Sequence, residues 1–205
     1  MKQWVIFDAM GVIFKVGDDV GELLVPFIRA RNKYIMPQKI SEVYKRASLG
    51  HISAQGFWER LGLGDAYPQI EREYLDGQLT LDDEFAKVAQ ELAKNYSLAM
   101  LSNDIGEWSA YLREKHGLDH YFEQVVISGD VGHRKPGNEI FAMMLERSKA
   151  KAGDCVFIDD NENNLIGAQE LGIKTILFGA TAKKTSAVAQ ADTLAQLAAL
   201  IPTIL

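Results

Sequence analysis

The sequence predicts an α/β protein: a Rossmann-like, doubly wound parallel sheet with an inserted helical cap subdomain. Short apolar runs alternate with amphipathic stretches, which is the pattern of parallel strands joined by crossover helices. Polar residues follow several of the runs, and one long helical interval breaks the alternation. The polar residues should therefore collect at the edge of the sheet where open α/β proteins bind ligands.

The predicted strands are short and almost wholly apolar, as expected for strands that are buried on both faces. They cover Trp4–Phe7, Leu98–Leu101, Val125–Ser128, Val156–Ile158 and Thr175–Phe178. Amphipathic patterns predict helices over Asp83–Lys94, Trp108–His116, Glu139–Ser148 and Asn163–Leu171. The final segment, Lys183–Leu205, is expected to form a strand or loop and then a short helix.

The interval from Lys15 to Leu79 contains no convincing strand. Helical patterns run over Gly21–Arg31, Gln38–Leu49, Ala54–Leu61 and Pro68–Leu75. One crossover connection needs only about a dozen residues, so this interval is too long for an ordinary crossover. We expect a catalytic core formed by residues 1–14 and 80–205, and a helical cap formed by residues 15–79 at the edge of the site.

Composition and charge exclude several classes of protein. The 205 residues are 47% hydrophobic, and the net charge of −6 argues against nucleic acid, which favours a basic face. No run approaches the roughly 20 apolar residues that span a membrane. The short apolar run after Lys2 ends at Asp8 and predicts no signal peptide, and the single cysteine, Cys155, allows no internal disulfide. We expect a cytoplasmic monomer or small homo-oligomer that binds neither nucleic acid nor membrane.

Polar clusters follow four of the predicted strands. They are Asp8, Ser102-Asn103-Asp104, His133-Arg134-Lys135-Pro136 and Asp159-Asp160-Asn161. A single polar residue after a strand is usually only a turn. In a parallel sheet, however, all four clusters would open onto one edge, so their side chains are expected to meet.

The residue types in these clusters suit phosphoryl chemistry. The carboxylates of Asp8, Asp159 and Asp160 are hard oxygen ligands of the kind that Mg²⁺ prefers, and they would repel one another without a cation. Lys135 can hold a phosphate and steady the nucleophile. The Ser102 hydroxyl and the Asn103 backbone N–H can donate to phosphate oxygens. Such a site suits attack by Asp8 on phosphorus, followed by hydrolysis of the aspartyl-phosphate.

In this order and spacing, the motifs resemble those of the haloacid dehalogenase-like hydrolases. The segments from Arg134 to Phe141 and from Asp159 to Ile173 are most similar to the sugar-phosphate phosphatases of that family, and the helical interval matches its cap. The resemblance implies a Mg²⁺-dependent hydrolase of small phosphorylated metabolites with Asp8 as nucleophile. The implied Mg²⁺ ligands are Asp8, the Met10 carbonyl and Asp160, with Asp159 adjacent or also ligating. Ser102, Asn103 and Lys135 would hold the phosphate.

Met10 departs from the family pattern. In the phosphatases this position usually carries a second aspartate, whose side chain protonates the leaving oxygen and later activates water. Met10 can supply the backbone carbonyl but not the proton, and such help is typically worth about 10²–10⁴-fold in rate. Three interpretations remain: a phosphatase that manages without this side chain, a metal-free 2-haloacid dehalogenase, or a non-catalytic binding or regulatory protein.

The last of the four clusters, Asp159-Asp160-Asn161, favours the phosphatase. Dehalogenases of the family carry small hydroxyl residues where this chain has Asp159 and Asp160, and a tyrosine where it has Phe141. Extra carboxylates beside a metal-free Asp8 would raise its pKa and repel a carboxylate substrate. The remaining charged candidates are expected on the surface: His133, Arg29 and Arg31, together with Asp18 and Asp19 in the turn that enters the cap.

Overall fold

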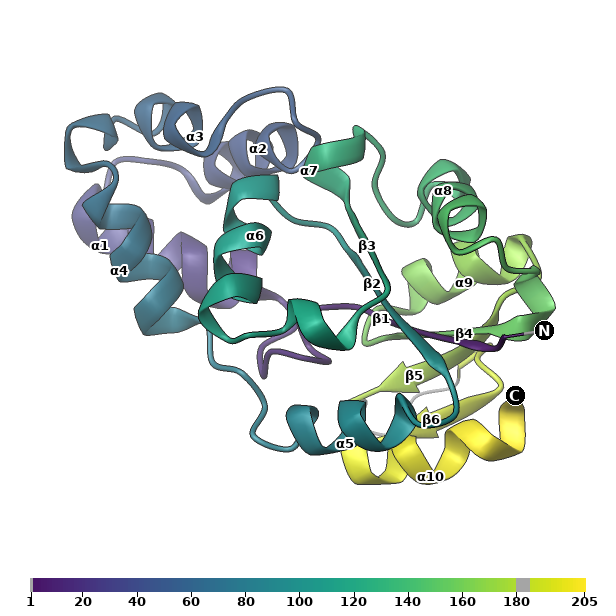
Figure 1. The fold of residues 1–205 in the computed structure, drawn as a ribbon. Helices are drawn as coiled ribbons and strands as arrows, with labels where there is room; N and C mark the ends of the chain where they lie inside the picture. Colours follow the sequence, from purple (N-terminus) through teal and green to yellow (C-terminus); the bar gives the residue numbers. More distant parts are fainter. Residues whose placement is uncertain (1, 180–184) are drawn as a thin grey trace.

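The computed structural model describes residues 2–179 and 185–205, and it confirms the predicted fold class (Figure 1). Its sheet has six parallel strands in the order β3-β2-β1-β4-β5-β6. The strands are β1 (Trp4–Phe7), β2 (Ser97–Ser102), β3 (Gln124–Ile127), β4 (Cys155–Asp159), β5 (Lys174–Phe178) and β6 (Ala189–Ala191).

Helices occupy the connections between the strands. The α-helices are α1 (Val25–Arg31), α2 (Pro37–Ala47), α3 (Ala54–Arg60), α4 (Gln69–Gln78), α5 (Phe85–Leu92), α6 (Gly106–Lys115), α7 (Ser128–Val131), α8 (Asn138–Ser148), α9 (Glu162–Glu170) and α10 (Leu194–Ile204). Short helical turns are η1 (Val20–Leu24), η2 (Gly64–Ala66), η3 (Asp119–Tyr121) and η4 (Ala152–Asp154).

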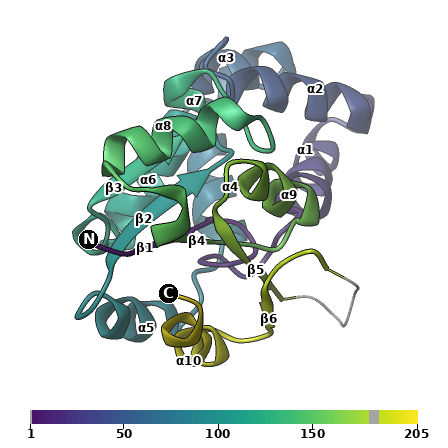
Figure 2. The same cartoon turned by 90° about the vertical axis from the view of Figure 1, so that its right-hand side faces the viewer.

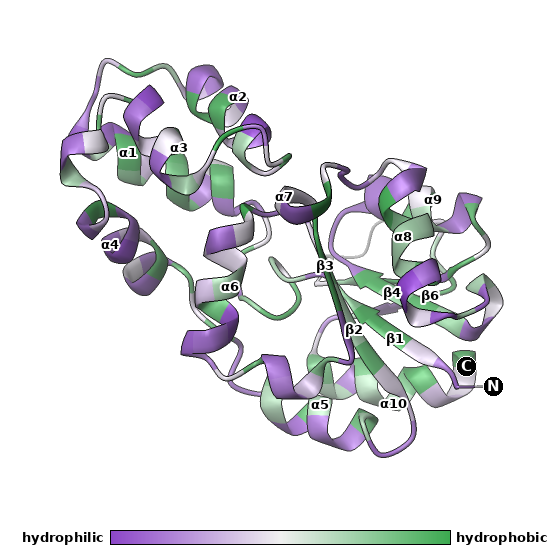
Figure 3. Cartoon of the chain, turned by 45° about the horizontal axis from the view of Figure 1, so that its top comes forward, coloured by the Kyte–Doolittle hydropathy of each residue, from purple (hydrophilic) through white to green (hydrophobic). Residues whose placement is uncertain are grey.

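The strands divide their side chains between two apolar layers. Successive side chains of a strand point to opposite faces, so Val5 and Phe7 pack with α5 and α10 while Trp4 and Ile6 pack with α8 and α9. Figure 2 shows these two helix pairs on opposite faces of the sheet. Because both faces are covered, the central strands β1, β2 and β4 are mostly apolar, as the green colouring of Figure 3 shows.

The order of the strands reverses between β1 and β4. The chain builds β1, β2 and β3 in one direction and then places β4, β5 and β6 on the other side of β1. The backbone N–H of Asp8 donates to the carbonyl of Ile158 at 2.9 Å, which extends the pairing of β1 with β4 by one residue. Asp8 and Asp159 thus flank the switch point at which open α/β sheets bind their ligands.

Helices α1 to α4 follow β1 and form a group beside the carboxyl ends of the strands (Figure 1). Aromatic side chains make up much of their contact with α6. Glu71 on α4 accepts hydrogen bonds from the indole N–H of Trp58 on α3, at 3.1 Å, and from that of Trp108 on α6, at 2.7 Å. The predicted boundaries of the core (1–14 and 80–205) and of the cap (15–79) stay a prediction.

Several element bounds differ from those predicted. The run Val125–Ser128 ends as a strand at Ile127, and the buried Ser128 begins α7. The predicted helix Gly21–Arg31 is split into a π-helical turn and α1. The final segment forms β6 and α10, although Lys183 and Lys184 lie outside the described residues. No helix within residues 2–179 and 185–205 is long and apolar enough to cross a membrane.

Candidate active site

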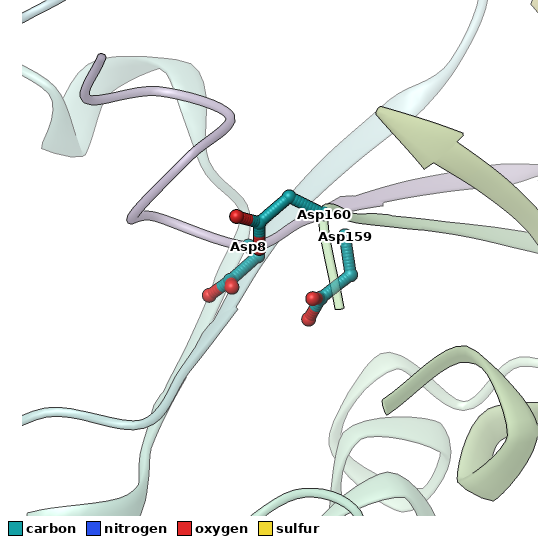
Figure 4. Close-up of side chains that lie close together, drawn as sticks. All are labelled: Asp8, Asp159 and Asp160. Atoms are coloured by element: carbon teal, nitrogen blue, oxygen red, sulfur yellow. The ribbon is translucent and has the colours of Figure 1, made fainter. Parts of the chain in front are cut away.

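Three carboxylates meet where β1 and β4 end. Figure 4 shows the side chains of Asp8, Asp159 and Asp160 gathered there, and one oxygen atom from each lies within 4.8 Å of the others. Asp8 and Asp159 are buried, and Asp160 is half-buried. Burial, and then the charge of Asp159, raise the pKa of Asp160 to about 6. Crowded, desolvated oxygen donors of this kind fit a hard divalent cation such as Mg²⁺.

Lys135 places its ammonium group between two of these acids. Its Nζ lies 2.7 Å from Oδ1 of Asp8 and 2.7 Å from Oδ2 of Asp159. Burial lowers the pKa of Lys135, but the two carboxylates outweigh this effect and the pKa is raised. For Asp8, burial and the charge of Asp159 outweigh Lys135, so its pKa is raised well above the ordinary value. Lys135 therefore fixes the orientation of Asp8 without removing the crowding of negative charge.

The carboxylate of Asp159 is fully engaged by its neighbours. Besides Lys135, it accepts from the Asn161 backbone N–H at 2.8 Å and from Nδ2 of Asn164 at 3.0 and 3.2 Å. Asn161 in turn caps the start of α9 by accepting from the N–H of Asn163. Asp159 thus positions Lys135, which leaves Asp160 as the better placed acid of the pair for a cation.

Asn103, from the polar cluster after β2, holds the loop that carries Lys135 in place. Nδ2 of Asn103 donates to the Lys135 carbonyl at 3.0 Å, and the Lys135 N–H donates to Oδ1 of Asn103 at 2.9 Å. This reciprocal pairing has no sequence signal beyond the residue types, because the partners are 32 positions apart. Ser102, the last residue of β2, is buried and lines the same cavity as Asp8 and Lys135.

Asp8 and Asp160 line a cavity of about 200 Å³. Core residues provide one wall, including Asp8, Ser102, Asn103 and Lys135. Met10 lines the cavity and is only 7% exposed. Its thioether carries no proton that it could donate to a leaving group. Phe141, by contrast, is fully buried against the ring of Phe157 in the apolar layer.

Residues from the helical interval close the cavity. The hydroxyl of Tyr44 on α2 donates to the carbonyl of Asn103 at 3.2 Å and lies 3.4 Å from Oδ1 of Asp104. At the end of α2, Ser48 contacts Arg134, and its carbonyl accepts from the hydroxyl of Ser128 at 2.5 Å. The interval therefore packs directly on the loops that follow β2 and β3.

One expected surface residue lies in the cavity wall instead. Asp19 is 8% exposed and lines the cavity, so the expectation that it is solvated is wrong. Its neighbour Asp18 is exposed, as expected, and accepts from the Gly21 N–H at 2.9 Å. Asp18 also lines the cavity, but it stays exposed to solvent, whereas Asp19 is buried. His133, Arg29 and Arg31 are exposed as expected.

Asp104 is buried beneath the site rather than ligating in it. Its Oδ1 accepts from the Ile105 N–H at 2.7 Å, at the start of α6. Burial, and then the charge of Asp19, raise the pKa of Asp104 to about 8. Asp19 in the cavity wall and Asp104 beneath it therefore interact through their charges. The sequence motifs did not indicate this pairing.

Substitution of Gly17 tests whether Asp160 belongs to the candidate Mg²⁺ site. A Cβ atom at Gly17 would overlap the carboxylate of Asp160, and the backbone there is not in the left-handed region. Gly17→Ala is therefore expected to displace Asp160 and to weaken Mg²⁺ binding by about 10–100-fold, the usual cost of disturbing the support of a metal ligand. Titration calorimetry would measure the affinity.

Gly77 provides the matched control for this substitution. A Cβ atom at Gly77, on α4, would meet nothing within 4 Å. Gly77→Ala should leave Mg²⁺ affinity unchanged and add helix stability of about 0.5–1 kcal/mol. Equal Mg²⁺ affinity in the Gly17 and Gly77 variants would contradict the placement of Asp160 in the metal site.

Comparison with known proteins gives the family. A family model described as haloacid dehalogenase-like hydrolase matches residues 2–172. The ribulose-1,5-bisphosphate 5-phosphatase of Halopiger xanaduensis is 28% identical over 136 residues, which cover 66% of this chain and 56% of that protein. The chain thus spans little more than half the length of that relative.

Solved structures share the fold at low sequence identity. A haloacid dehalogenase-like phosphatase from Thermococcus onnurineus has a TM-score of 0.75 at 21% identity, over 98% of each chain. The L-2-haloacid dehalogenase of Xanthobacter autotrophicus has a TM-score of 0.73 at 19% identity, over the full length of both chains. Phosphatases and dehalogenases therefore fit the fold equally well, and the family match carries the assignment. The chain belongs to the haloacid dehalogenase-like hydrolases.

Proposed function

We propose that this hydrolase is a Mg²⁺-dependent phosphatase of small phosphorylated metabolites that works through an aspartyl-phosphate intermediate. The observation that carries the proposal is the pairing of Asp8 with Lys135 beside Asp160 in one cavity. A dehalogenase attacks with a lone carboxylate and has no use for two further acids beside it. A phosphatase needs them, because its dianionic substrate must be neutralised by a cation.

The site residues divide into three roles. Asp8 attacks phosphorus, and Lys135 holds both the nucleophile and a phosphate oxygen. Ser102 and the backbone of Asn103 donate to the remaining phosphate oxygens. Asp8, the Met10 carbonyl and Asp160 would hold Mg²⁺, which supplies charge neutralisation of the phosphoryl group when bound. We assign Asp159 to positioning Lys135, since both of its oxygens accept hydrogen bonds.

The relatives support a sugar phosphate as substrate. The Halopiger xanaduensis protein is named for a phosphorylated pentulose, and polar groups dominate the cavity lining of this chain. Residues of the helical interval, among them Tyr44, line the same cavity as the nucleophile. We propose that the cap, residues 15–79, selects the organic part of the substrate.

Paired assays on the purified chain separate the phosphatase from a dehalogenase. The phosphatase should release inorganic phosphate from a panel of sugar and nucleotide monophosphates in Mg²⁺, and release should stop when EDTA removes the metal. A dehalogenase would release halide from 2-chloropropionate in EDTA. Halide release without metal would refute the proposal, and so would the absence of both activities across the panel.

A further inference from the structure

Among the described residues, Asp19 is the one buried acid outside the family motifs that lines the proposed reaction cavity; its neighbour Asp18 also lines the cavity but is exposed. Asp19 lies in the turn that enters the helical interval, and it lines the same small cavity as Asp8, Met10 and Lys135. The cavity measures about 200 Å³. A phosphate ester bound to Asp8 in so small a space must also contact the wall that Asp19 helps to form.

The surroundings of Asp19 favour a carboxyl group that keeps its proton. The side chain is buried, and the charge of Asp18 lies close enough to oppose its ionisation. Burial, followed by Asp18, raises the pKa of Asp19 to about 7, which is close to the pH at which a general acid works best. Electrostatic interactions connect it with Asp104, Tyr44 and Tyr74, which come from three different elements.

Tyr74, on α4, is a second buried polar group on which the charge of Asp19 acts. Its phenol oxygen is fully buried and has no hydrogen-bond partner in the described part of the chain. Buried polar atoms are rarely left without a partner, and each such case needs an explanation. The charges of Asp19 and Asp104 both act on this phenol.

We propose that Asp19 is the general acid and base of this phosphatase, in the place of the carboxylate that Met10 lacks. The inference rests on the proposed function. In the first step, an Asp8 oxygen forms a bond to phosphorus while the bond from phosphorus to the leaving oxygen breaks. Asp19 gives its proton to that oxygen, which departs as an alcohol.

In the second step, Asp19 acts as the base. Its carboxylate takes a proton from water, and the water oxygen attacks phosphorus. The bond between phosphorus and Asp8 then breaks. Inorganic phosphate leaves, and both Asp8 and the protonated Asp19 are restored.

The dependence of rate on the leaving group tests this role. A p-nitrophenolate leaves readily without a proton, whereas a phenolate needs one far more. With Mg²⁺ present, Asp19→Asn should lower kcat/KM for phenyl phosphate by about 10²–10⁴-fold. The same variant should keep kcat/KM for p-nitrophenyl phosphate within a few-fold of the parent. Glu22→Gln, a change of an exposed acid that does not line the cavity and lies in the helical turn after Asp19, should alter neither.

Restoring an acid at the family position gives the complementary variant. Met10→Asp introduced into the Asp19→Asn chain should recover phenyl phosphate hydrolysis, which also shows that the chain folds. If Asp19→Asn lowers kcat/KM equally for both substrates, or for neither, the assignment of Asp19 is wrong. The proposal that the protein is a phosphatase would still stand. If the parent chain releases phosphate in Mg²⁺ neither from these two esters nor from the sugar and nucleotide monophosphates, the phosphatase proposal itself fails and the role of Asp19 fails with it.

Discussion

Replacement of Asp8 by asparagine is expected to lower kcat/KM for phosphate release by at least about 10³-fold, as removal of a covalent nucleophile does elsewhere. The amide cannot form the bond to phosphorus, so the two-step route is closed. The shape of the side chain is kept, and its oxygen can still accept from the Ala9 N–H, a bond of 2.7 Å in the parent. The variant also removes one of three crowded carboxylates, so it should unfold at the same temperature as the parent or higher.

Phosphate release from the best substrate of the panel, measured beside thermal unfolding by circular dichroism, checks both halves of this expectation. Asp83→Asn is the matched control, because Asp83 is an exposed acid whose only described ion pair is with Lys15 at 3.0 Å. That control should retain full activity. An Asp8→Asn chain that is folded and still active would show that another group attacks phosphorus.

Replacement of Lys135 by methionine is expected to destabilise the fold by about 3–5 kcal/mol at neutral pH, the usual cost of removing one partner from a buried ion pair. Methionine fills the space of the lysine stem, so packing changes little. Asp8 and Asp159 are then left buried and facing each other without a cation. The loss should exceed that of any single surface ion pair in the chain.

The pH dependence of this loss has a definite sign. The pKa of Lys135 is raised in the folded protein, so its contribution to stability is complete at neutral pH and disappears only as pH rises through that raised pKa. In Lys135→Met, the fold is destabilised by the charges of Asp8 and Asp159, which have lost their buried cation. The pKa of Asp8 is raised by burial, so acidification protonates it and should shrink the difference from the parent.

Urea unfolding at pH 7 and pH 5 measures both the loss and its pH dependence. Lys15→Met is the matched control: Lys15 pairs with Asp83 across the surface, and its side chain is 45% exposed. Such exposed pairs contribute about 0–1 kcal/mol. Similar losses in the two variants would show that the charge of Lys135 does not hold the site together.

The fold could be predicted from the sequence because the strands of a buried parallel sheet are recognisable as short apolar runs. Strands such as Trp4–Phe7 are apolar throughout, since neighbours cover both faces. The short edge strand Ala189–Ala191 was less clear, because only its last residue is buried and no apolar run marks it. The four strand-end clusters were expected to meet, and the structure places Asp8, Ser102, Lys135 and Asp160 around one cavity.

The rest of the site depends on contacts that no local pattern encodes. Two adjacent acids in a turn look solvated, and only the folded chain shows that Asp18 is exposed while Asp19 is buried. The contact between Gly17 and Asp160 joins residues far apart in sequence, as does the pairing of Asn103 with Lys135. Such pairs follow from where the loops cross, which is decided by the packing of the whole fold.

The shared carboxylate of Glu71 gives this protein an optical reporter of its own. Two of the three tryptophans, Trp58 and Trp108, donate to it, and their rings lie 5.9 Å apart. Trp58 belongs to the helical interval, whereas Trp108 belongs to the helix that follows β2. A movement that parts these helices takes at least one indole from its acceptor and changes its surroundings. The intrinsic fluorescence of the unlabelled chain would therefore report any such movement in real time.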